Sequence, residues 1–206
     1  MAPYIGDDGP EQGTDGILRD ERRLSYTFRR GTSFFICVNT ETWQGGLTAA
    51  DTGHVPLAWV KEKLAQGQAD PSVENIFVFG HKPVSVLETD DPLPTITAAQ
   101  GNLFYALLNE TPKVRAYLCA HAHRWTYRIP VSGGRLPQLS AGNAGSIGDE
   151  AFKPGYYGYT MVHILESGDV TVESWGRPIP APYCDQTPQP VSTVRERFTL
   201  YRRGIP

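Results

Sequence analysis

The chain has 206 residues, 40% of them hydrophobic, and 19 Lys and Arg against 22 Asp and Glu. This is enough for one globular domain with a substantial core. Without an excess of basic groups, the composition argues against nucleic acid or an anionic membrane surface as a partner. No apolar run approaches the ~18 to 20 residues of a membrane span, and the acidic N-terminus is unlike a signal peptide. Compartment and oligomeric state stay open.

The first half of the chain alternates predicted strands and helices. Residues 1–23 are polar, lack an apolar period and are expected to form a loop. Residues 24–42 alternate around Gly31 and then become apolar, which predicts a hairpin with a buried strand over 34–38. The remaining predicted elements are a helix over 56–66, a strand over 75–81, a helix over 99–110 and a strand over 114–121. We expect Leu103, Phe104 and Leu107 on the apolar face of the second helix.

The second half changes to short strands separated by turns. Four strand-like segments follow, at 124–131, 136–146, 157–167 and 169–176. This order predicts an α/β fold, with a mixed sheet that contains parallel strands and continues into an antiparallel meander. Residues 177–206 are rich in proline and are expected to run as an extended tail over the surface. The predicted organisation is therefore an N-terminal loop at 1–23, a domain at 24–176 and a tail at 177–206.

Three histidines stand where a ligand site would form. His81 and His121 come at the carboxyl ends of predicted parallel strands, the edge at which open α/β sheets bind ligands. His123 lies two residues further, and in an extended segment it would project to the same side as His121. Imidazole binds Zn, Fe, Mn and Co, so the three residues are candidate metal ligands. His54 and His163 lack such neighbours and are expected to be structural.

The residues around these histidines resemble a known family. Residues 79–83 (FGHKP) and 120–123 (AHAH) are similar to the G-H-x-P and G-H-x-H motifs of calcineurin-like metallophosphoesterases, and residues 24–42 and 136–146 are similar to the flanking segments. The resemblance covers about residues 24–176 and implies the C-terminal half of an αββα sandwich. It implies a hydrolase of phosphate esters, a phosphatase or phosphodiesterase, with two divalent metal ions such as Mn, Fe or Zn. His81 and His121 would bind one ion and His123 the other.

The same comparison shows what the sequence lacks. The family's D-x-H, G-D-x-x-D and G-N-H motifs are absent, so its catalytic residues and substrate contacts have no counterpart to name. Three neutral imidazoles cannot balance the charge of two cations, and this chain alone is expected to bind one ion or none. N-terminal truncation of a longer domain is the favoured explanation, and a natural short protein without catalysis is the other. Truncation would expose a strand edge and favour self-association.

Two other functions stay open. The fold could serve as a non-catalytic binding or scaffold module, which the missing carboxylates favour and the retained histidines disfavour. Alternatively, His81, His121 and His123 could share a single zinc ion with one open position, as in a zinc-water hydrolase. Metal content separates these possibilities, because a scaffold has no need of a bound ion.

Overall fold

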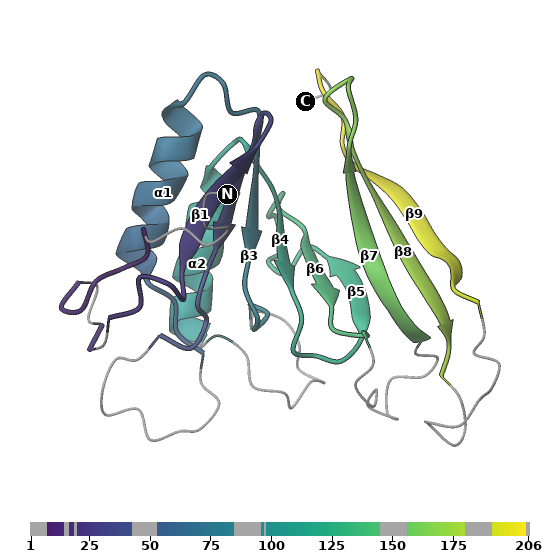
Figure 1. Cartoon of the computed structure of the whole chain (residues 1–206), viewed down its shortest axis with the longest axis horizontal. Coiled ribbons are helices and arrows are strands. Elements are labelled where there is room, and N and C mark those ends of the chain that lie inside the picture. Colours follow the sequence, from purple (N-terminus) through teal and green to yellow (C-terminus); the bar gives the residue numbers. More distant parts are fainter. Residues whose placement is uncertain are drawn as a thin grey trace, which may run out of the picture. The chain divides into compact units, whose positions relative to one another are not determined.

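The computed structural model describes residues 8–14, 17–18, 20–42, 53–84, 96, 98–144, 156–179 and 191–204. The chain divides into two compact units. The first comprises residues 1–121 and 127–139, and the second comprises residues 122–126 and 140–206. Strands dominate both units, and the two helices belong to the first (Figure 1).

The first four strands form the frame that positions the histidines. Strand β1 (Tyr26–Arg30) pairs antiparallel with β2 (Ser33–Cys37), through a turn in which Gly31 has a φ of 56° that glycine adopts without strain. Strands β2, β3 (Asn75–Phe79) and β4 (Val114–Cys119) run parallel to one another. With β5 (Trp125–Arg128) and β6 (Gln138–Ala141), the sheet order is β1-β2-β3-β4-β6-β5. The predicted hairpin and parallel strands are confirmed, and the fold is α/β.

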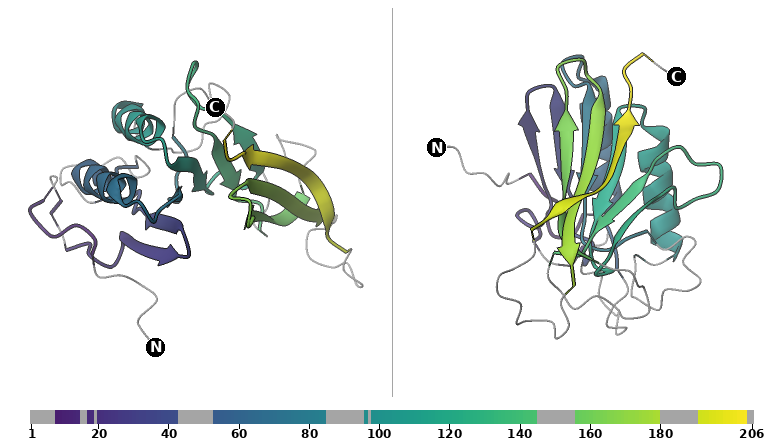
Figure 2. Two further views of the ribbon diagram at one scale, coloured as in Figure 1. Left: turned by 90° about the horizontal axis from the view of Figure 1, so that it is seen from above. Right: turned by 90° about the vertical axis from the view of Figure 1, so that its right-hand side faces the viewer.

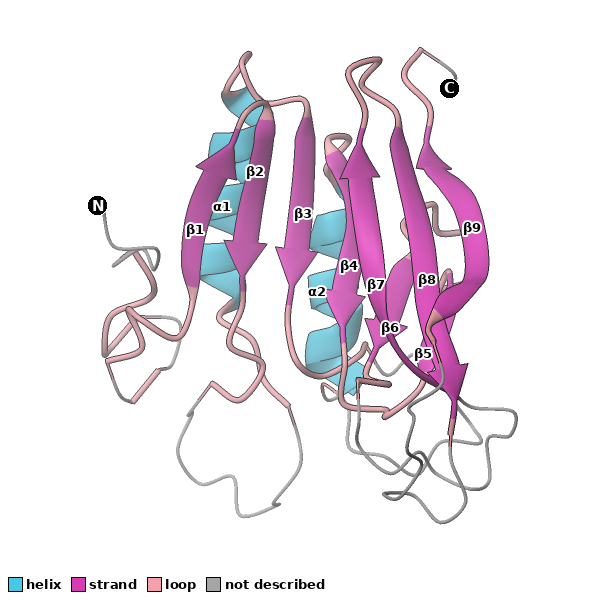
Figure 3. Ribbon diagram, turned by 45° about the vertical axis from the view of Figure 1, so that its right-hand side comes forward, coloured by secondary structure: helices cyan, strands magenta, loops and turns pink. Residues whose placement is uncertain are grey.

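Two helices cover one face of this sheet. Figures 1 and 3 show α1 (Leu57–Ala69) and α2 (Ala98–Glu110) on the same side of the strands. Both contribute to a core that they share with the inner face of the sheet. Each helix has 13 residues, and no helix in the described ranges is long and apolar enough to cross a membrane.

The predicted apolar face of α2 was wrong at one position. Leu103 is 58% exposed, whereas Phe104 is fully buried. The buried side of the helix consists of Phe104, Tyr105 and Leu108, with Leu107 partly buried beside them. Their spacing of one and four residues follows the helical period, and it places Leu103 just outside the stripe that contacts the sheet.

The second unit contains a three-stranded antiparallel sheet (Figure 2). Its strands are β7 (Tyr156–Ile164), β8 (Val170–Pro178) and β9 (Thr193–Tyr201), in the order β7-β8-β9. Burial alternates along β8, as expected of a strand with one covered face. Strand β9 lies in the segment predicted as an extended surface tail, and it pairs with β8 instead. Its β-branched and aromatic residues come after the last of the closely spaced prolines at Pro190, which explains why the tail regains a strand there.

Candidate metal centre

The structure brings His81 and His121 together at the carboxyl edge of the sheet. Each residue follows its strand by two positions, after β3 and β4. The Nδ1 atom of His121 lies 2.9 Å from Nε2 of His81, and the two rings meet edge to face with an interplanar angle of 82°. The backbone supports this approach, because the N–H of Ala120 donates to the carbonyl of His81 at 3.0 Å.

The spacing of the two imidazole nitrogens suits a shared metal ion. Nitrogens bound at about 2.0 to 2.1 Å, with an angle of about 90° to 109° between them, lie about 2.8 to 3.4 Å apart. The observed 2.9 Å is within this range. In the pair as it stands, one of the two facing nitrogens carries the proton of the hydrogen bond, and an ion would take the place of that proton. Together, His81 and His121 could supply two ligands to one ion.

The backbone beyond β4 differs from the expected extended segment. His121 has a φ of 58° and His123 a φ of 40°, so both lie in the left-handed region. The argument that alternate residues project to the same side was therefore wrong, because the strand ends at Cys119 and the chain bends. Left-handed residues other than glycine cost about 1 to 2 kcal/mol each and are concentrated at functional sites. His123 has an exposed side chain and belongs to the second unit.

Among the residues that the structure describes, the set of donors is incomplete for a two-metal site. Among the described residues, no group of three or more His, Cys, Asp or Glu side chains could hold a metal ion. The imidazoles of His81 and His121 fit a transition metal in donor type and spacing. Two cations need bridging oxygen ligands as well, and this part of the chain does not bring carboxylates to the pair.

Several residues that sequence reasoning missed hold the turn after β3. The side chain of Lys82 is only 4% exposed, and its Nζ lies 2.6 Å from Oε1 of Glu41. The Lys82 backbone N–H donates to Oγ1 of Thr40 at 3.1 Å, and the Lys82 carbonyl accepts from the hydroxyl of Tyr117 at 2.6 Å. Lys82 stands within the recognised motif, but no sequence signal linked it to Glu41, Thr40 or Tyr117.

His54 lies beside this network in a buried position. It is 9% exposed, and its backbone N–H donates to the carbonyl of Thr40 at 2.9 Å. Neither ring nitrogen has a hydrogen-bond partner among the described residues. Burial lowers the pKa of His54, an effect that nearby Glu41 partly opposes and Lys82 adds to. His54 is therefore a neutral imidazole near neutral pH.

Acidification is expected to destabilise the protein through His54. As the pH falls through about 6.5, the ordinary histidine value, the unfolded chain binds a proton there. The folded state stays neutral until the pH falls to its lower pKa. The stability present above about pH 6.5 is therefore lost progressively below it. Urea unfolding of wild type and His54→Leu at a series of pH values measures this. The variant should become more stable relative to wild type as the pH falls. Parallel pH profiles of the free energy of unfolding in the two proteins would show that folding does not shift the pKa of His54.

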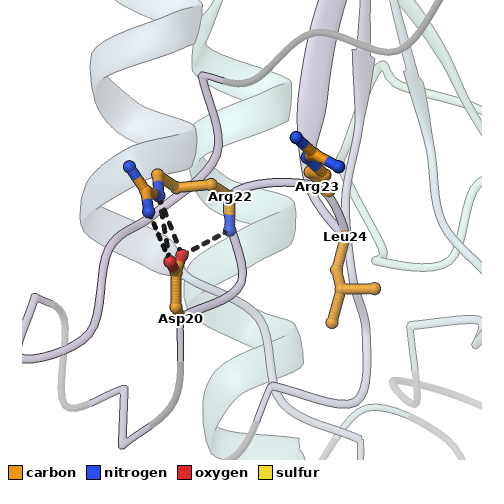
Figure 4. Close-up of a pocket in the computed structure, with 4 residues that line it drawn as sticks. All are labelled: Asp20, Arg22, Arg23 and Leu24. Atoms are coloured by element: carbon orange, nitrogen blue, oxygen red, sulfur yellow. Dashed lines mark hydrogen bonds and ion pairs between the residues drawn. The ribbon is translucent and has the colours of Figure 1, made fainter.

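A depression in the protein surface lies near the start of the described chain. It is lined by Asp20, Arg22, Arg23 and Leu24 (Figure 4). The guanidinium of Arg22 binds the Asp20 carboxylate, with Nη2 2.6 Å from Oδ2, and the Arg22 backbone N–H donates to the same group. These bonds lower the pKa of Asp20, which stays ionised and engaged with Arg22. The lining contains no histidine or cysteine, and we assign the depression no part in the metal centre.

Comparison with known proteins agrees with this fold. No family model matches the sequence, and no protein of curated function matches it. Among solved structures, a dimetal phosphatase from Danio rerio aligns with a TM-score of 0.50 and 14% identity, covering 75% of this chain and 57% of the phosphatase. Over the aligned residues, the chain shares its fold with this phosphatase. It thus spans little more than half of that protein's length.

A second match is weaker. A Staphylococcus aureus protein, proposed to be a 5′-nucleotidase, aligns with a TM-score of 0.46 and 16% identity, covering 91% of this chain and 34% of that protein. At that score the similarity does not bear on the fold. Of these two matches, the phosphatase alone supports the α/β assignment.

Proposed function

We propose that this chain carries part of a metal-dependent phosphoesterase site. In this proposal His81 and His121 bind one divalent ion, and His123 is a ligand of a second. The distance of 2.9 Å between the His81 and His121 nitrogens carries the proposal, because it suits two ligands of a single ion. Two further observations support it: the left-handed backbone at His121 and His123, and a fold shared with a dimetal phosphatase.

The substrate proposed is a phosphate ester. Bound divalent ions would supply positive charge to the phosphoryl oxygens and lower the pKa of a bound water. The residues of this chain would contribute the imidazole nitrogens that bind the ions at the sheet edge. The sequence lacks the motifs that supply bridging carboxylates, and we therefore propose that hydrolysis requires a further segment of a longer domain.

Metal binding by single-histidine variants tests the proposal. Titration of the metal-free protein with Mn²⁺, Co²⁺ or Zn²⁺, followed by calorimetry, should give weaker binding in His81→Ala and His121→Ala by at least about tenfold. The matched control is His163→Ala, because His163 is not a proposed ligand. It lies on β7, where its Nε2 is 3.6 Å from Oε2 of Glu173. Equal affinity in wild type and both test variants would overturn the ligand assignment.

The same titration separates the competing functions. A non-catalytic binding module is favoured by the lack of a three-ligand group among the described residues, and it predicts that no divalent ion binds tightly. A single ion shared by three histidines predicts one equivalent of metal and loss of that ion in His123→Ala. The proposed arrangement predicts that His123→Ala leaves the ion held by His81 and His121 in place.

A further inference from the structure

The turn that carries His81 is tied to β4 by three hydrogen bonds. The Gly80 N–H donates to the carbonyl of Leu118 at 3.0 Å, and the Ala120 N–H donates to the carbonyl of His81 at 3.0 Å. The third bond runs from the hydroxyl of Tyr117 to the carbonyl of Lys82 at 2.6 Å. The first two use backbone groups alone. The third depends on one side-chain atom and can be removed by substitution.

The Tyr117 hydroxyl is held firmly in place. The side chain is buried, and its ring packs edge to face against Phe104 of α2, with ring centroids 5.1 Å apart. Burial raises the pKa of Tyr117 well above its usual value, so the hydroxyl keeps its proton and acts as a donor. A Cβ atom at position 80 would overlap this hydroxyl, so Gly80 leaves the room that the bond needs.

The location of this bond connects it to both histidines. Tyr117 belongs to β4, the strand that leads to His121, and its acceptor Lys82 directly follows His81. Lys82 is also anchored by its ion pair with Glu41 and by the bond from its N–H to Thr40. The turn after β3 is therefore fixed on one side to the segment after β2 and on the other to β4. Movement of this turn would alter the distance between the two imidazoles.

We infer that Tyr117 is a positioning residue for the His81–His121 pair. Its hydroxyl fixes the turn after β3 against β4 and so sets the separation of the two facing nitrogens. The inference rests on the proposed function insofar as that separation serves metal binding. Outer groups that orient metal ligands commonly change metal affinity by about 10- to 100-fold when removed.

Tyr117→Phe tests this with a close control. The variant removes the hydroxyl and keeps the ring that contacts Phe104. Tyr105→Phe makes the same chemical change at a buried tyrosine whose hydroxyl donates to the carbonyl of Leu136 at 3.0 Å. Both variants should lower Tm similarly, since each loses one buried hydroxyl bond to the backbone. Tyr117→Phe alone should weaken divalent-metal binding, by about 10- to 100-fold.

A second measurement needs no metal. The nuclear Overhauser effect between ring protons of His81 and His121 reports their separation in the metal-free protein, and it should weaken in Tyr117→Phe and persist in Tyr105→Phe. An unchanged effect in Tyr117→Phe, or equal changes in both variants, would overturn the inference. If wild type binds no divalent metal, the proposed function fails, and the Overhauser effect still decides whether Tyr117 positions the pair.

Discussion

Phe104→Ala is expected to lower the free energy of unfolding by about 3 to 5 kcal/mol. The side chain is fully buried between α2 and the sheet, and its ring packs against Tyr117. Truncation removes that apolar area from the core and leaves a cavity that the parallel strands cannot close without moving. Urea unfolding measured by circular dichroism gives the change directly.

The neighbouring Leu103 is the control for this prediction. It belongs to the same helix and is 58% exposed, so Leu103→Ala should change stability by no more than about 0.5 kcal/mol. Similar losses in the two variants would mean that α2 packs with a different face toward the sheet. Near-neutral results for both would mean that α2 contributes little to the core.

Much of the frame around the candidate site could be predicted from the sequence. The apolar runs of β3 and β4 identify buried strands, and an intervening helical period favours a parallel arrangement of the two strands, as observed. Parallel strands end at the same sheet edge, so the residues that follow them lie near one another. Those steps are enough to place His81 and His121 side by side. The contact of 2.9 Å adds detail to a placement that periodicity already implies.

Other features could not be predicted because tertiary contacts decide them. Leu103 and Phe104 are both apolar and adjacent, and the sheet determines which of them is buried. The left-handed residues at His121 and His123 depend on where the ladder of β4 ends, a boundary that composition does not reveal. Tyr117 resembles an ordinary core residue in an apolar strand, and its bond to Lys82 joins positions 35 residues apart.

Glu41→Gln is expected to lower the free energy of unfolding by about 1 to 3 kcal/mol, more than Lys82→Met does. Exposure alone would suggest that substitution of the more buried residue costs more, and Lys82 is 4% exposed against 51% for Glu41. The expected order is the reverse. Removal of the carboxylate deprives a buried ammonium of this charged partner. Removal of the ammonium leaves a carboxylate that water can hydrate, at a cost of less than about 1 kcal/mol. Unfolding in urea compares the two variants.

The predicted order depends on which partner is desolvated. Removal of one partner from a buried ion pair typically lowers the free energy of unfolding by about 3 to 5 kcal/mol. The access of water to Glu41 reduces that figure here. Added salt should change the result little, because the ammonium is shielded from mobile ions. A larger loss in Lys82→Met, which keeps most of the alkyl chain, would mean that the ammonium group itself stabilises the fold more than the Glu41 carboxylate does. Because Lys82 directly follows His81, loss of this ion pair in Glu41→Gln should also loosen the contact between His81 and His121. An ion pair that lay in solvent would leave the separation of the two histidines unchanged.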